Sequence, residues 1–309
     1  ALLENAGVID LAAAHQAAQG AALPAFATME ALIASGERRL DAARELASEP
    51  PDGTVHGLDE IELLSPLPRP PQMRDFLCFE KHLVQAFEAV IKVRAALSED
   101  PETAERELRE SGAYAIPEVW YQQPTYYKCS RFAVTGTDTD VAWPEYSNVI
   151  DYELELAMVI GPGGKDIPRD QAAQHIFGYT IFNDFSARDT QSVEMEAKLG
   201  PAKGKDFDGA NVLGPCIVTA DEIGNPYALE MIARVNGTEW SRGNSRDMHY
   251  EFEDLIAYVS RSETLHPGEV FGSGTVGNGC GLELGKFLQR GDTVELEIEK
   301  IGLLRNQVL

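Results

Sequence analysis

Paired cysteines are the first feature that this 309-residue chain lacks. Its four cysteines are far apart in the sequence and form no Cys-x-x-Cys motif. Secreted domains that depend on disulfides have a much higher cysteine density. We therefore expect the protein to work in a reducing cytoplasm.

Basic residues are also scarce. The chain has 26 Lys and Arg against 50 Asp and Glu, which gives a formal net charge of -24 at pH 7. Such a charge repels phosphate backbones and anionic lipid surfaces. The sequence contains no apolar run of 18 residues and no Gly-x-x-x-x-Gly-Lys-Ser/Thr motif. We expect neither nucleic acid nor a membrane as a partner.

The composition is that of a globular protein, because 44% of the residues are hydrophobic and can bury a large core. Residues 1–65 predict a small α/β appendage, in which Asp10 is a favourable N-cap for an alanine-rich helix. A proline-rich linker leads into a main domain, residues 66–309. Residues 83–116 predict a helical insertion that acts as a lid, and most of the rest predicts strands. The predicted fold class is α+β, mainly β.

The segment 151–160 alternates acidic and apolar residues, as a half-polar strand does. One face of this strand collects three carboxylates, those of Asp151, Glu153 and Glu155. A hard divalent metal would relieve their mutual repulsion. A solvent-facing strand is the alternative, because the same alternation recurs at Glu295, Glu297 and Glu299. A second strand-like run ends at Asp184, which is a candidate third ligand.

Three further segments contain candidate functional groups. His82 follows Asp75 by seven residues, in a stretch that combines a carboxylate, an apolar patch and an imidazole. Residues 198–205 are glycine-rich and basic and end at Lys205, which fits either a mobile surface loop or a loop that binds an anionic substrate. The glycines of residues 272–277 would let backbone amides approach a ligand closely.

In this order the motifs resemble those of the fumarylacetoacetate hydrolase family, over residue 66 to the C-terminus. The shared motifs are Asp75 with His82, Glu153-x-Glu155, Asn183 to Gln191, Gly204 to Phe207, Gly214-Pro215, Val235 to Gly237, Ser273 to Thr275 and Leu288 to Asp292. Each motif is short, but the ordered set is specific.

The resemblance implies a mixed β-roll or β-sandwich core, one divalent metal and a homodimer. The implied metal ligands are Asp75, Glu153, Glu155 and Asp184, an all-oxygen set that suits Mg²⁺ or Mn²⁺, with Ca²⁺ as the alternative. The implied catalytic residues are His82, which activates water, Glu283, which orients it, and Lys205. The implied substrate-binding residues are Tyr127, Arg188, Gln191 and Thr275.

The chain also departs from the family pattern. Leu77 replaces a tyrosine that some full-length members have, and a short helical appendage replaces their N-terminal β domain. Fumarylacetoacetate itself is therefore a doubtful substrate. Our first hypothesis is metal-dependent hydrolysis of a C–C bond in a 1,3-diketo acid, such as an acylpyruvate. The alternatives are decarboxylation, isomerisation or dehydration of a 2-oxo or sugar acid, and, third, a metal-binding protein without catalytic activity.

Overall fold

The computed structural model describes residues 1–3 and 7–309. Its N-terminal part is a small three-stranded antiparallel sheet with three helices. The elements are β1 (Leu2–Leu3), β2 (Gly7–Ile9), α1 (Leu11–Gln19), α2 (Met29–Ala34), α3 (Glu37–Ser48) and β3 (Val55–Gly57). Asp10 caps α1 as predicted, because its side chain accepts the backbone N–H groups of Ala12 and Ala13.

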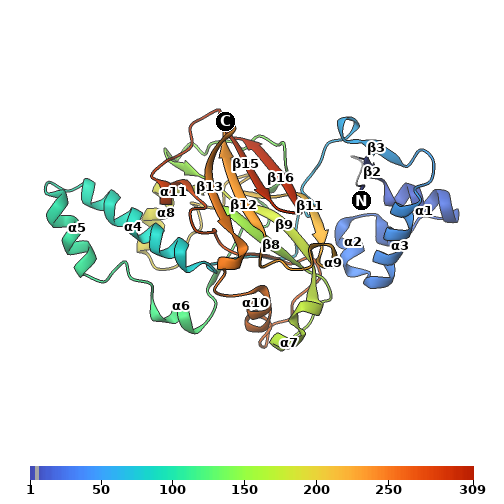
Figure 1. The fold of residues 1–309 in the computed structure, drawn as a ribbon, viewed down its shortest axis with the longest axis horizontal. Helices are drawn as coiled ribbons and strands as arrows, with labels where there is room; N and C mark the ends of the chain where they lie inside the picture. Colours follow the sequence, from blue (N-terminus) through green and yellow to red (C-terminus); the bar gives the residue numbers. More distant parts are fainter. Residues whose placement is uncertain (4–6) are drawn as a thin grey trace.

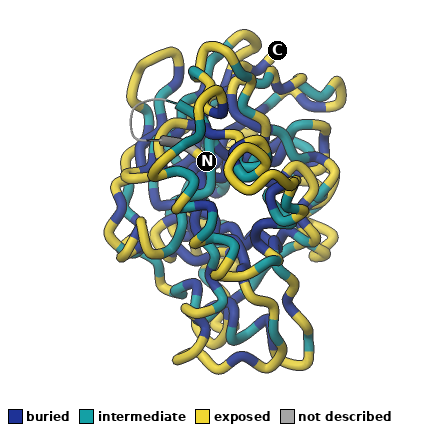
Figure 2. The backbone as a smooth tube through the Cα atoms, turned by 90° about the vertical axis from the view of Figure 1, so that its right-hand side faces the viewer, coloured by how far each residue is buried: buried dark blue, intermediate teal, exposed yellow. Residues whose placement is uncertain are grey.

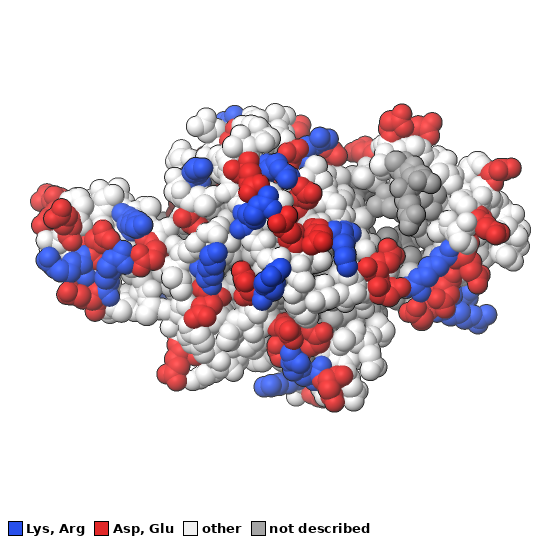
Figure 3. All heavy atoms as spheres, viewed as in Figure 1, with Lys and Arg blue, Asp and Glu red and all other residues white. Residues whose placement is uncertain are grey.

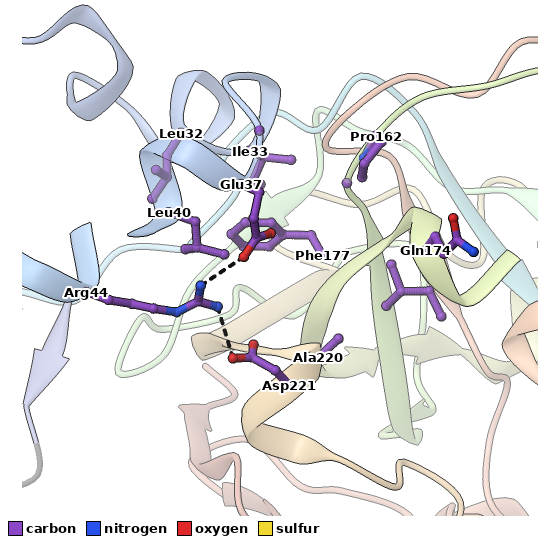
Figure 4. Close-up of a pocket in the computed structure, with 13 residues that line it drawn as sticks. Leu32, Ile33, Glu37, Leu40, Arg44, Pro162, Gln174, Phe177, Ala220 and Asp221 are labelled. Carbon is purple, nitrogen blue, oxygen red and sulfur yellow. Dashed lines mark hydrogen bonds and ion pairs between the residues drawn. The ribbon is translucent and has the colours of Figure 1, made fainter. Parts of the chain in front are cut away.

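This appendage packs against one end of the main domain, at the right of Figure 1. Ile33 of α2 belongs to a buried apolar cluster with Leu67, Val159 and Leu213 of the main domain. Beside this contact, Arg44 of α3 forms an ion pair of 3.0 Å with Asp221, across a cavity of about 280 Å³ between the two parts (Figure 4). Apolar packing therefore joins the appendage to the main domain, and a surface ion pair closes its edge.

The main domain is organised around a seven-stranded mixed sheet. In spatial order its strands are β5 (Tyr126–Lys128), β4 (Met73–Phe76), β14 (Val270–Gly272), β8 (Leu154–Ile160), β9 (Ile176–Asp184), β11 (Asn211–Thr219) and β6 (Val134–Thr135). β8 is antiparallel to both of its neighbours, β14 and β9. It is therefore a central strand, and all seven of its residues are buried.

A second, four-stranded sheet covers one face of the first. Its strands are β13 (Thr238–Asn244), β12 (Glu230–Val235), β15 (Thr293–Ile298) and β16 (Gly302–Gln307). Leu154 and Leu156 of β8 share the main hydrophobic cluster with Met231 of β12 and Leu296 of β15. Figure 2, seen from the appendage side, shows this buried interior surrounded by exposed loops.

Short elements complete the domain. They are β7 (Ile150–Asp151) paired with β10 (Ser186–Ala187), and the helices α4 (Glu80–Ala96), α5 (Pro101–Glu110), α6 (Glu118–Gln122), α7 (Arg169–Ala172), α8 (Arg188–Glu196), α9 (Ala220–Ile223), α10 (Phe252–Val259) and α11 (Gly281–Leu284). Among the described residues, no helix is both long and apolar enough to cross a membrane.

The α4–α5 hairpin contains most of the segment that was predicted as a helical insertion. It projects from the body of the molecule at the left of Figure 1, and Figure 3 shows charged side chains of both signs covering it. No residue of α5 is buried. α4, in contrast, contacts α11 in the main domain, where its His82 lies beside Glu283. The hairpin thus begins at the candidate site and extends away from it, and its function as a lid stays a prediction.

Candidate active site

The three acidic residues of the predicted strand are all buried. Asp151 lies in β7, Glu153 forms an isolated bridge with Cys280, and Glu155 lies in β8. Asp151 and Glu155 are 0% exposed and Glu153 is 5% exposed. The solvent-facing alternative is therefore wrong for this strand, and each carboxylate needs a partner inside the protein.

Three carboxylates from three strands meet at one point. Asp75 of β4, Glu155 of β8 and Asp184 at the end of β9 each offer an oxygen, and these oxygens lie within 4.8 Å of one another. Gly272 of β14 lies beside them, and a Cβ atom there would come within 2.7 Å of the Asp75 Oδ1 atom. The Gly274 N–H donates to both Asp75 and Glu155, at 3.1 Å each. The glycine loop therefore brings a backbone amide to this centre, and its predicted approach to a ligand stays a prediction.

The charge state of this centre fits a divalent cation. Burial, and then the nearby Asp184 carboxylate, raise the pKa of Asp75 to about 8. Burial also raises the pKa of Asp184 to about 6, although Lys205 opposes the shift, and it raises the pKa of Glu155 well above its usual range. Glu155 Oε1 and Asp184 Oδ1 are buried without a hydrogen-bond partner among the described residues. A hard cation would satisfy both oxygens and remove the repulsion.

Glu153 lies beside this centre and is engaged by two cations. The Lys205 Nζ atom is 2.6 Å from Glu153 Oε2 and 2.6 Å from Asp184 Oδ2. The Arg188 Nη1 atom is 2.8 Å from Glu153 Oε1. Burial alone would raise the pKa of Glu153, but Lys205, Arg188 and His82 together lower it to about 2. Glu153 is therefore an ionised carboxylate whose oxygens pair with side chains, and its predicted role as a fourth ligand stays a prediction.

Two of the residues predicted to bind substrate contact the acidic network directly. The Tyr127 hydroxyl of β5 donates to Asp184. Arg188, at the start of α8, donates to Asp151 at 2.8 Å as well as pairing with Glu153, so the guanidinium already serves two buried carboxylates.

The other two lie next to these groups. Gln191 accepts from Arg188 at 3.0 Å, and Thr275 is buried in the loop after β14. Tyr127 and Arg188 therefore contact the acidic network, whereas Gln191 contacts Arg188 and Thr275 follows Gly274 in the sequence. Their role in substrate binding stays a prediction.

His82 and Glu283 form the second part of the site. The His82 Nδ1 atom lies 3.2 Å from Glu283 Oε1, and both side chains are at most 10% exposed. Glu283 is held by the backbone N–H groups of Asn278, at 3.2 Å, and Cys280, at 3.0 Å. Cys280, which holds Glu283, bridges to Glu153, and Glu153 shares Lys205 with Asp184, so this pair lies beside the acidic centre. A carboxylate-oriented histidine next to a cation site is suited to transferring protons.

Asp151 has a function that sequence reasoning missed. Its two oxygens accept the N–H groups of Gly281, at 2.7 Å, and Leu282, at 2.9 Å, which begin α11 and so position Glu283. One signal was visible in the sequence, namely the position of Asp151 two residues before Glu153. Its partners lie 130 residues away, however, and no local pattern identifies them.

The loop after β14 also contains the spacing Gly272-x-Gly274-x-x-Gly277, which occurs in dinucleotide-binding folds. Here no helix begins until Gly281, and the Gly274 amide faces carboxylates. The loop therefore lacks the helix N-terminus that binds a pyrophosphate.

Comparison with known proteins places the chain among recognisable relatives. The sequence model of the family described as Fumarylacetoacetate (FAA) hydrolase C-terminal matches residues 97–309, a stretch that begins after Asp75 and His82. A mitochondrial oxaloacetate tautomerase of Homo sapiens is 38% identical over 189 residues, which are 61% of this chain and 60% of that protein. An oxaloacetate tautomerase of Bacillus subtilis is 31% identical over 284 residues, which are 89% of this chain and 84% of that protein.

Solved structures confirm the predicted fold. The 5-carboxymethyl-2-hydroxymuconate delta-isomerase of Mycobacterium smegmatis aligns with a TM-score of 0.62 and 28% identity, covering 84% of each chain. The fumarylacetoacetate hydrolase of psychrophilic Exiguobacterium antarcticum aligns with a TM-score of 0.68 and 26% identity, covering 91% of this chain and 87% of that one.

Proposed function

The chain belongs to the fumarylacetoacetate hydrolase family, and from that premise we propose that it is a divalent-metal-dependent tautomerase of a 2-oxo dicarboxylic acid such as oxaloacetate. The observation that carries the proposal is the pairing of His82 with Glu283 beside three converging carboxylates. The relatives named above as oxaloacetate tautomerases support the choice of reaction. The proposal selects one of the alternatives from the sequence, in place of the hydrolysis that we placed first.

The residues have separate tasks in this proposal. Asp75, Glu155 and Asp184 would hold Mg²⁺ or Mn²⁺, with Ca²⁺ as the alternative, because all of their donor atoms are oxygens. When bound, the ion would supply a Lewis acid that makes the C–H group next to a ketone more acidic. Lys205 adds a buried positive charge that stabilises a developing enolate.

His82 transfers the proton. Its Nδ1 atom faces Glu283, which leaves the other ring nitrogen for the substrate. That nitrogen removes a proton from the carbon between the ketone and the distal carboxylate, and the oxygen of the resulting enolate accepts a proton to give the enol. Glu283 stabilises the imidazolium formed between these two transfers. The proton taken from the carbon is balanced by the proton that the enolate oxygen accepts. The reaction therefore needs no water and no redox partner.

Substitution of His82 tests this proposal. His82→Ala should lower kcat for oxaloacetate ketonisation by roughly 10²- to 10⁴-fold, the usual contribution of a general base. Mn²⁺ affinity, measured by calorimetry, should stay close to that of the unmodified protein, because His82 is not among the three converging carboxylates. The exposed His266→Ala is the matched control. Equal losses of kcat and of Mn²⁺ affinity in His82→Ala would contradict the division of tasks.

Hydrolysis of a 1,3-diketo acid is the second candidate, because the same His82–Glu283 pair could take a proton from water instead of from carbon. Incubation with acylpyruvates in ¹⁸O-labelled water separates the two reactions. Label in a carboxylate product supports hydrolysis, whereas enol–keto exchange without label supports tautomerisation. Release of carbon dioxide would indicate decarboxylation. If no 2-oxo acid is turned over with metal present, a metal-binding protein without activity becomes the better explanation.

Assembly and location belong to the same set of proposals. We keep the homodimer, which the family resemblance implies, and light scattering that gives 33.8 kDa would contradict it. All four cysteines are free thiols, which agrees with a reducing cytoplasm. The human relative is named as mitochondrial, so fractionation of the native host is the deciding measurement.

A further inference from the structure

A second group of metal-ligating side chains lies next to the three-carboxylate centre. His82, Cys280 and Glu283 each offer one donor atom, and these atoms lie within 4.8 Å of one another. The His82 Nδ1 atom is 3.2 Å from Glu283 Oε1, and the Cys280 Sγ atom is 3.4 Å from Glu283 Oε2. Nitrogen, sulfur and oxygen donors therefore converge at one place.

These separations match the edges of a tetrahedral zinc site. Zn–N and Zn–O bonds are about 2.0–2.2 Å long and Zn–S bonds about 2.3 Å, so neighbouring ligand atoms lie roughly 3.3–3.6 Å apart. A histidine, a cysteine and a carboxylate would leave the fourth position open, as in zinc sites with three protein ligands. One Glu283 oxygen would have to serve both neighbours, and the His82 and Cys280 donor atoms already lie within 4.8 Å of each other.

Two observations stay unexplained by proton transfer alone. The buried His82 Nδ1 atom makes no aligned hydrogen bond to any described residue, although Glu283 is near. The Cys280 side chain is 0% exposed, its thiol donates to Glu283 Oε2 at 3.4 Å, and it takes no direct part in the proton transfer proposed above. Both are accounted for if an ion can lie between the three side chains.

We propose that His82, Cys280 and Glu283 form a second metal site, selective for a thiophilic ion such as Zn²⁺, whose occupation stops proton transfer by His82. The two sites differ in hardness. The carboxylate centre has only oxygen donors, which suit Mg²⁺ or Mn²⁺, whereas the second site contains a thiolate and an imidazole, which bind Zn²⁺ far better. The inhibitory part rests on the proposed function of His82, and the binding part does not.

Binding involves no redox change. The Cys280 thiol loses its proton to solvent as the S–Zn bond forms, and neutral His82 donates its Nδ1 lone pair. Glu283 contributes one carboxylate oxygen, and a water molecule completes the tetrahedron. With Nδ1 bound to the ion, the ring proton of neutral His82 lies on the other nitrogen, which then has no lone pair to accept a proton from the substrate.

Cobalt substitution tests the site without any substrate. The protein is saturated with Mg²⁺, titrated with Co²⁺, and observed for the thiolate-to-cobalt charge-transfer band in the near ultraviolet. We expect the band in the unmodified protein and in Cys216→Ser, the matched control, because Cys216 lies elsewhere and contacts Ile301. We expect Cys280→Ser to lose it.

Each outcome decides the proposal. Absence of the band from the unmodified protein, or its persistence in Cys280→Ser, would overturn the site. Thermal unfolding in Mg²⁺ shows whether Cys280→Ser is folded, and Cys280→Ala replaces it if it is not. Loss of the thiolate should also weaken zinc inhibition, measured against each variant's own zinc-free rate, by more than the roughly 10- to 100-fold typical of outer-shell changes. If the band appears but zinc does not inhibit, the site stands and the function of His82 is wrong.

Discussion

Two strands of this protein have the same acidic alternation and opposite environments. Glu155 in β8 and Glu153 just before β8 are buried. Glu295 and Glu297 of β15, in contrast, are partly exposed. Glu153 pairs with buried Lys205 and Arg188, and Glu155 meets two other carboxylates. On β15, Glu297 pairs with Arg234, whose side chain is 28% exposed.

Position in the sheet explains this difference. β8 lies between β14 and β9, and both of its faces are covered. β15 places Val294, Leu296 and Ile298 in the core and leaves its glutamates on the outer side. Alternation thus predicts that three carboxylates share one face of a strand. Whether that face binds water or a cation depends on whether other elements of the fold pack against it.

The largest contrast should come from removing one glutamate of each strand. Glu155→Gln should lower kcat/KM with Mg²⁺ by at least about 10³-fold, because the Lewis acid contributes several kcal/mol and its site loses a ligand. Glu297→Gln should leave kcat/KM within a factor of two. Steady-state kinetics with calorimetry of Mn²⁺ binding checks both variants, and equal activity of the two would contradict the site.

Removing the counter-ion of each strand should affect stability. Lys205→Met leaves Glu153 and Asp184 buried without their shared cation, and loss of a partner from a buried pair costs about 3–5 kcal/mol of unfolding free energy. Arg234→Met on β15 should cost about 0–1 kcal/mol. Urea unfolding without added metal measures both, and similar losses would mean that burial does not distinguish the strands.

The pH should change how much metal stabilises the buried centre. In the metal-free protein the pKa of Asp75 is raised to about 8, so the folded state holds a proton that the unfolded chain releases above about pH 4. This contribution to stability is complete below that pH and is lost as the pH rises towards 8. We therefore expect Mg²⁺ to raise Tm more at pH 8 than at pH 5.5, and Glu155→Gln to lose most of this difference while Glu297→Gln keeps it. A metal effect independent of pH would contradict the protonated centre.

The smallest effect concerns α5, which is as exposed as the outer side of β15 but is predicted to act at the site. Replacing residues 98–113 with a short Gly-Ser linker keeps His82 and α4. If the hairpin is a lid, KM should rise roughly 2- to 10-fold with a smaller change in kcat. Unchanged kinetic constants would show that α5 is a surface element with no part in catalysis.

Much of this site could be predicted from the sequence, because its motifs are local or belong to a recognisable order. Asp184 ends its strand beside Glu155, and His82 meets Glu283 as the family resemblance implied. Local periodicity could not indicate that Asp151 holds the start of α11, since that contact spans 130 residues. It could also not show that Arg188 is already occupied by two carboxylates.

The reaction was the least predictable property. Tautomerisation, hydrolysis and decarboxylation can share the same carboxylates and the same histidine. In tautomerisation His82 takes a proton from carbon and in hydrolysis from water, whereas decarboxylation breaks a C–C bond without a base. The reacting atom belongs to the substrate or to water, and neither is encoded in a motif.

The packing of the appendage has a consequence for how such a protein can be rebuilt. Glu155 shares its strand face with Ala157 and Val159, and those two residues lie in the apolar cluster that Ile33 of α2 completes. The appendage therefore covers the same strand face on which Glu155 lies, but farther along the strand. None of the site residues comes from the appendage. We therefore expect that another apolar cap could replace residues 1–65 without changing any of these groups, provided that it covers the same apolar cluster.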